Sequence, residues 1–189
     1  MKRLSRYLQI EHSPGSYRTD FAVHAVTVAL MAIYLITAAP PARQVTLGLA
    51  AWLAAIGWSL LEYVLHRFVL HGIQPFKGWH AAHHSTPRAL ICTPIVLSAT
   101  LIATLVFLPA WLLGDRWLAT ALTFGLLAGY LMYTATHHAI HHWRADGIWI
   151  RQRKHCHALH HDPGRPAGYY GVTSRLWDDV MGTAHRRDF

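Results

Sequence analysis

The chain has 189 residues, of which 53% are hydrophobic and 14% charged, a composition that excludes an ordinary soluble domain of this length. The formal net charge of +8 raises the question of a nucleic-acid partner. However, every Lys and Arg except Arg43 and Arg116 lies in one of three polar segments, residues 1–20, 66–93 and 137–189. That distribution fits membrane topology better than a basic binding patch, so no nucleic-acid partner is expected.

Four apolar segments have the length of about 20 residues that a bilayer requires. In chain order they are residues 21–39, 45–65, 94–113 and 117–136. We do not expect the first to be a cleaved signal peptide, because a polar arm precedes it, its apolar stretch is too long and further apolar segments follow. The sequence therefore predicts an all-α integral membrane protein whose four transmembrane helices form two hairpins.

The three polar segments complete the predicted organisation. Residues 1–20 form an arm, and residues 66–93 and 137–189 form a histidine-rich cap in which Gly and Pro leave room only for short helices. Because these segments carry the basic residues, the positive-inside rule places both termini and the cap in the cytoplasm. The excess of Arg over Lys and the abundant Ala favour a bacterial protein, so we expect the inner membrane.

Most of the sixteen histidines fall into four clusters at helical spacing. Residues at i, i+3 and i+4 share one face of a helix, and this rule brings together the imidazoles within three of the clusters. His66 and His71 are five residues apart, so they share a face only if the helix ends or is distorted just after His66. The candidate ligands are His66, His71, His80, His83, His84, His137, His141, His157, His160 and His161.

Imidazole is the commonest metal ligand in proteins, and ten imidazoles are too many for one ion and suit two. The carboxylate ligands of soluble di-iron bundles are missing, since the chain has only two glutamates, Glu11 and Glu62. Other polar residues near the clusters are candidates for orienting a ligand by a hydrogen bond, although each has an alternative role in packing or on the solvated surface. They are His138, His142, His155, Glu62, Asp162 and Asp178.

These motifs resemble the fatty acid hydroxylase and sterol desaturase superfamily of membrane di-metal enzymes. The resemblance lies in H-x-x-x-x-H at 66–71, H-x-x-H-H at 80–84 and 157–161, H-x-x-x-H at 137–141, and the segment 170–178 that follows. It implies that residues 1–189 form a single fatty acid hydroxylase-like membrane domain with two iron ions, or zinc as isolated, held by the ten histidines. Neither haem nor flavin is expected.

The resemblance also implies O2-dependent hydroxylation of a lipid C–H bond by a non-haem di-iron monooxygenase. Larger eukaryotic fatty acid 2-hydroxylases of this family carry a cytochrome b5 domain before the first span, where this chain has 20 residues. We therefore expect electrons from a separate donor, either a cytochrome b5-like protein or a ferredoxin with its reductase.

Other functions remain open at this point. A carotenoid hydroxylase or a lipid desaturase would use the same histidine motifs and the same chemistry. A divalent-metal transporter or a zinc-binding membrane scaffold is a different class, because imidazoles also suit zinc. Transporters place their ligands near the bilayer midplane, whereas these clusters lie at one end of the predicted spans.

Overall fold

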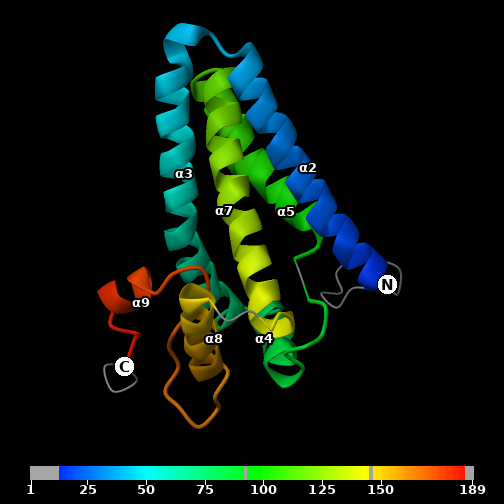
Figure 1. Ribbon diagram of the computed structural model, residues 1–189, viewed down its shortest axis with the longest axis vertical. Helices are drawn as coiled ribbons and strands as arrows, with labels where there is room; N and C mark the ends of the chain where they lie inside the picture. Colours follow the sequence, from blue (N-terminus) through cyan, green and yellow to red (C-terminus); the bar gives the residue numbers. More distant parts are fainter. Residues whose placement is uncertain (1–12, 92, 145–146, 186–189) are drawn as a thin grey trace. The chain divides into compact units, whose positions relative to one another are not determined.

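The computed structural model describes residues 13–91, 93–144 and 147–185, so residues 1–12 of the predicted arm lie outside the described residues. Every multi-residue element of regular structure in these ranges is a helix (Figure 1). In chain order the elements are α2 (Pro14–Ala38), η1 (Pro41–Arg43), α3 (Gln44–Val64), η2 (Leu65–Leu70), α4 (Phe76–Ser85), α5 (Ile95–Ile102), η3 (Ala103–Phe107), α6 (Leu108–Leu113), α7 (Arg116–His142), α8 (Ile148–His160) and α9 (Leu176–Val180).

Four helical segments in the described residues are long and apolar enough to cross a membrane, and the predicted all-α class is confirmed. They are Pro14–Ala38, Pro41–Leu70, Ile95–Leu113 and Arg116–His142. The first begins before the predicted span because Ser13 caps it, accepting a hydrogen bond at Oγ from the amide of Ser16, 3.3 Å away. Pro14 at the first helical position favours the same start.

The chain forms two compact units, which we call the first unit (residues 1–57 and 90–131) and the second unit (residues 58–89 and 132–189). The core of the first unit consists of three alanines, from the end of α2, from α3 and from α7, together with one larger side chain each from α3 and α7. Its buried members are Ala39, Leu47, Ala51, Trp117 and Ala121. Small residues let the backbones of membrane helices approach closely, which replaces the hydrophobic driving force that lipid cannot supply.

Gly125 lies where the backbone of α7 comes close to that of α3 in the first unit. A Cβ atom at this position would lie 1.9 Å from the carbonyl oxygen of Ala51. On the outside of the same unit, large apolar side chains such as Val45 (77% exposed) and Leu113 (90% exposed) face away from the core. Exposure of this extent suits contact with hydrocarbon better than contact with water.

The second unit contains α4, α8 and α9 and the C-terminal parts of α3 and α7 (Figure 1). All four histidine clusters fall within it. It is therefore the unit that carries the candidate site.

We expect Gly125→Ala to destabilise the protein by about 1–3 kcal/mol, because the added methyl group overpacks the contact with Ala51. Gly48→Ala is the matched control on α3, since no atom lies within 4 Å of the position of its new Cβ. The control should be neutral or more stable by up to about 1 kcal/mol. Thermal unfolding of both variants in detergent, followed by tryptophan fluorescence, measures the difference. Equal stability of the two variants would contradict the close packing of α7 on α3.

Candidate metal centre

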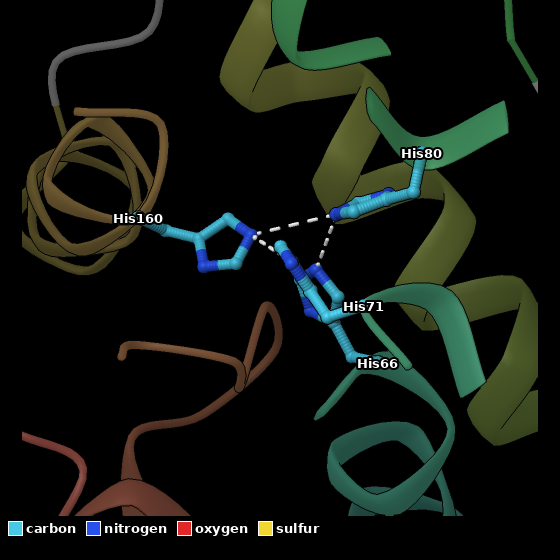
Figure 2. A group of neighbouring side chains, drawn as sticks. All are labelled: His66, His71, His80 and His160. Atoms are coloured by element: carbon cyan, nitrogen blue, oxygen red, sulfur yellow. Dashed lines mark hydrogen bonds between the residues drawn. The ribbon is translucent and has the colours of Figure 1, made fainter. Parts of the chain in front are cut away.

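The first group of imidazoles consists of His66, His71, His80 and His160. One ring nitrogen of each lies within 4.8 Å of those of the others. Figure 2 shows the four rings converging, with His160 on α8 opposite the other three, which come from η2, from the residue directly after it and from α4. His84 joins this group, because its Nε2 lies 3.0 Å from Nε2 of His80 and 3.1 Å from Nε2 of His160. The first group therefore offers five imidazoles.

The second group consists of His83, His141, His157 and His161, whose ligand nitrogens also lie within 4.8 Å of one another. Nε2 of His141 is 2.8 Å from Nε2 of His157. His137 joins this group through its Nε2, which lies 3.1 Å from Nε2 of His83. All ten histidines singled out in the sequence thus lie in two groups of five.

The π-helix η2 explains how His66 and His71 reach the same group. The amide of His71 donates a hydrogen bond to the carbonyl of His66 five residues earlier, at 3.2 Å, and this widened turn puts both side chains on one face. Gly72 then lets the chain turn away, since a Cβ atom there would lie 2.1 Å from the carbonyl oxygen of Phe68. The spacing in the sequence called for a distortion at this place, and the π-helix provides it.

Helices α4 and α8 each supply both groups, so the two groups are neighbours. From α4, His80 and His84 enter the first group while His83 enters the second. From α8, His160 enters the first group while His157 enters the second, together with His161 directly after the helix. The rings of His84 and His161 stack across the boundary, with centroids 4.0 Å apart and an interplanar angle of 7°.

Hydrogen bonds to backbone carbonyls fix the tautomers of two rings in the first group. Nδ1 of His66 donates to the carbonyl of Tyr170, and Nδ1 of His160 donates to the carbonyl of Gly168 at 2.7 Å. A carbonyl oxygen can only accept, so Nδ1 carries the hydrogen and Nε2 of each neutral ring presents a lone pair. These nitrogens lie 2.9 Å from Nε2 of His80 and 3.1 Å from Nε2 of His71, respectively.

Burial keeps the imidazoles of the cap neutral. It lowers the pKa of His71 to about 4, that of His83 and His160 to about 3, and that of His161 to about 2. Neighbouring imidazoles lower these pKa values further, because a second positive charge would be repelled. At neutral pH each ring therefore keeps one nitrogen with a free lone pair, and a cation at the centre of each group could bind these lone pairs. The residues fit one metal ion per group, and imidazole suits iron and zinc.

Two buried carboxylates, Glu62 and Asp178, hold the tail segment 170–173 in place. Glu62 accepts hydrogen bonds from the amides of Val172 and Thr173, while Asp178 accepts from the amides of Tyr170 and Gly171. The sequence marked both acids as partners for a ligand imidazole, and the structure gives them backbone partners instead. The carbonyls of Gly168 and Tyr170, which do orient ligands, were missed because a backbone group leaves no signature in the residue types.

The other residues marked in the sequence lie outside the two groups. The rings of His138 and His142 stack on each other with centroids 4.6 Å apart, and His142 and His155 are exposed. Asp162 accepts a hydrogen bond from the amide of Gly164 at 2.9 Å and pairs with Arg165 at 3.4 Å, so it shapes the turn after α8.

Comparison with known proteins agrees with the family resemblance of the histidine motifs. Residues 51–183 match the family model described as fatty acid hydroxylase. The chain is 36% identical over 149 residues to the dihydroceramide fatty acyl 2-hydroxylase FAH2 of Arabidopsis thaliana. This alignment covers 72% of this chain and 61% of that protein. It is 32% identical over 153 residues to the ceramide very long chain fatty acid hydroxylase SCS7 of Saccharomyces cerevisiae. That alignment covers 71% of this chain and 38% of the yeast protein.

A solved structure of scs7p, in which only the hydroxylase domain is visible, is also similar. The TM-score is 0.71 at 26% sequence identity, and the match covers 87% of this chain and 64% of that chain. The chain thus spans less than two thirds of the length of the proteins it matches.

We expect Gly72→Ala to weaken metal binding by the first group by at least about tenfold, the scale of an effect on ligand orientation. The added methyl group cannot fit against the carbonyl of Phe68, so the turn after η2 must open and displace His71. Titration of metal-stripped protein with Zn²⁺ against a competing chelator measures the change. Gly147→Ala is the control, because its Cβ would meet only Cγ2 of Ile150 at 3.9 Å. Unchanged affinity in Gly72→Ala would mean that this turn does not position His71.

Proposed function

The chain belongs to the fatty acid hydroxylase family, and we propose that it adds a hydroxyl group to the alkyl chain of a fatty acyl lipid. The observation that carries the proposal is the convergence of neutral imidazoles into two adjacent groups in one unit of a membrane protein. The resemblance seen in the histidine motifs is confirmed at the level of the family.

We propose that each group holds one iron ion, with zinc able to replace it in purified protein. Iron, when bound, supplies the electron transfer to O2 that makes attack on an alkyl C–H bond possible. The chain's own contribution is to orient the imidazoles, chiefly through the carbonyls that accept from His66 and His160. Burial of these rings also excludes water, which protects reactive species from side reactions.

For the substrate, we propose a fatty acyl chain, free or in ceramide, hydroxylated at the carbon next to its carbonyl. The support comes from the names of the relatives, which are a fatty acyl 2-hydroxylase and a ceramide fatty acid hydroxylase. The overall reaction consumes O2 together with an electron pair and a pair of protons, and gives the hydroxyl and one water. We propose a separate protein, a cytochrome b5-like carrier or a ferredoxin with its reductase, as the source of the electrons.

We further propose that residues 1–20, 66–93 and 137–189 face the cytoplasm of a bacterial cell and that the spans cross its inner membrane. The four membrane-length helices support an integral membrane protein. The orientation rests on the basic residues, which are concentrated in these three segments.

Metal content tests the proposed centre. We expect about two ions per chain in detergent-purified protein by mass spectrometry, one for each group. His83→Ala removes a ligand from the second group and His160→Ala one from the first, so each variant should lose metal. His155→Ala is the control, because this exposed histidine on α8 belongs to neither group. Wild-type protein with no metal, or with content unaffected by either variant, would refute the di-metal centre and favour a transporter or scaffold.

Product analysis separates the proposed reaction from its chemical relatives. We expect protein supplied with fatty acyl lipid, reductant and O2 to yield a product heavier by one oxygen atom, with the label of 18O2 incorporated. The variant His160→Ala is the matched inactive control. A product that has lost two hydrogens would identify a desaturase. Hydroxylation of a carotenoid in place of the acyl lipid would identify a carotenoid hydroxylase.

A further inference from the structure

We extend the tail segment to residues 168–173, so that it includes both carbonyls that orient a ring. Among the described residues, its backbone carbonyls accept hydrogen bonds from only one of the two imidazole groups. The carbonyls of Gly168 and Tyr170 accept hydrogen bonds from Nδ1 of His160 and His66, and both of these rings belong to the first group. In the second group, Nδ1 of His83 and Nδ1 of His157 are buried, and no atom of the described residues accepts a hydrogen bond from them. The two groups are therefore supported differently.

Asp178 fixes the centre of this segment. Its carboxylate is fully buried and accepts three hydrogen bonds, from the amides of Tyr170 and Gly171 at 2.8 Å each and from Oγ1 of Thr183 at 2.6 Å. The two amides bind different oxygens, Oδ1 and Oδ2, so the carboxylate spans both peptide groups. Gly171 makes this approach possible, because a Cβ there would lie 2.9 Å from Oδ2 of Asp178 and 2.0 Å from the carbonyl oxygen of Ser174.

Glu62 ties the same segment to the helix that carries His66. It lies one turn before His66 near the end of α3 and is only 3% exposed. Oε1 accepts from the amides of Val172 and Thr173 at 2.6 and 2.9 Å, and Oε2 accepts from the hydroxyl of Thr173 at 2.6 Å. His66 thus donates to the carbonyl of Tyr170, and Glu62, one turn earlier, accepts from the amides of Val172 and Thr173 in the same segment.

This closed set of hydrogen bonds makes the segment rigid. A shift of residues 170–173 would leave buried amides and carboxylates without partners, and each unmet group costs about 1–3 kcal/mol. The carbonyl of Tyr170, which orients His66, is therefore held in place before any metal arrives. The carbonyl of Gly168 is held through the next residue, because the amide of Tyr169 donates to the carbonyl of Thr183 at 3.3 Å and the hydroxyl of Thr183 donates to Asp178. An arrangement prepared in advance loses less freedom on binding and binds more tightly.

We propose that Glu62 and Asp178 are positioning residues for the first group alone, and that the two metal sites consequently bind with unequal affinity, the first more tightly than the second. The inference rests on the proposed di-metal function and adds an order to it: the first site fills before the second and empties after it. The two carboxylates act through the backbone of segment 168–173 and not by direct contact with an imidazole.

The test is a titration of metal-stripped full-length protein in detergent with Co²⁺, followed by its visible absorption against a competing chelator. Wild-type protein should bind in two steps. Removal of the tighter step in His160→Ala and of the weaker step in His83→Ala assigns the steps to the groups. The opposite assignment, or two steps of equal affinity, overturns the proposal.

Asp178→Asn should weaken the tighter step by about 10–100-fold and leave the weaker step unchanged. Asn places an NH2 group against one of the two backbone amides, and two donors cannot pair. The weaker step reports on folding in the same sample, because general damage to the second unit would lower both affinities. Equal weakening of both steps means a merely structural role and overturns the proposal. Asp162→Asn, at an exposed carboxylate in a turn, is the matched control.

Glu62 offers a comparison between a conservative and a disruptive variant. Glu62→Gln keeps an oxygen for both amides and sets its NH2 group against a hydroxyl that can accept, so the tighter step should stay near its wild-type affinity. Glu62→Leu removes all three acceptors and should weaken that step selectively. Equal affinities in the two variants overturn the role of Glu62. Metal binding with no hydroxylated product would refute the proposed function alone, whereas no metal binding at all would refute both.

Discussion

The convergence of ten imidazoles in two small groups is the constraint on which the rest of the second unit depends. Neutral rings whose Nε2 atoms lie about 3 Å apart, as in His66 and His80 or His71 and His160, either share a hydrogen between them or turn their lone pairs toward a common cation. The π-helix, the short helix α4, the helix α8 and the tail segment are all ways of bringing these rings together from distant parts of the chain. Burial contributes as well, because it keeps the rings unprotonated and so able to bind a metal.

Much of this arrangement could be predicted from the sequence, because helical spacing is a local property. The i, i+3, i+4 rule correctly identified His80, His83 and His84 as neighbours on one turn, and the apolar segments identified the four membrane-length helices. The rule could not divide the histidines between two groups. His83 enters one group and His84 the other although they are adjacent in the chain, and only the positions of the other helices decide this.

The features that could not be predicted are those formed by hydrogen bonds of backbone groups. The five-residue spacing of His66 and His71 indicated a distortion, but no residue type predicts the backbone hydrogen bond of a π-helix. In the same way, the sequence pointed to Glu62 and Asp178 as partners of imidazoles, since a carboxylate commonly orients a metal-binding histidine. In this fold carbonyl groups take that role, and the acids hold the carbonyls.

The separation of acids from ligands has a consequence for the proposed chemistry. Among the described residues, the groups able to hold a metal contain histidine alone, while the nearby buried carboxylates are fully used by backbone amides and hydroxyls. Neutral donors leave the charge of a bound ion uncompensated, and in a buried setting that charge is felt strongly. An ion held in this way favours its lower oxidation state more than one held by carboxylates, since each anionic ligand stabilises the higher charge. Under the proposed function, imidazole ligands therefore suit a centre that a separate electron donor would keep reduced until O2 and a lipid arrive.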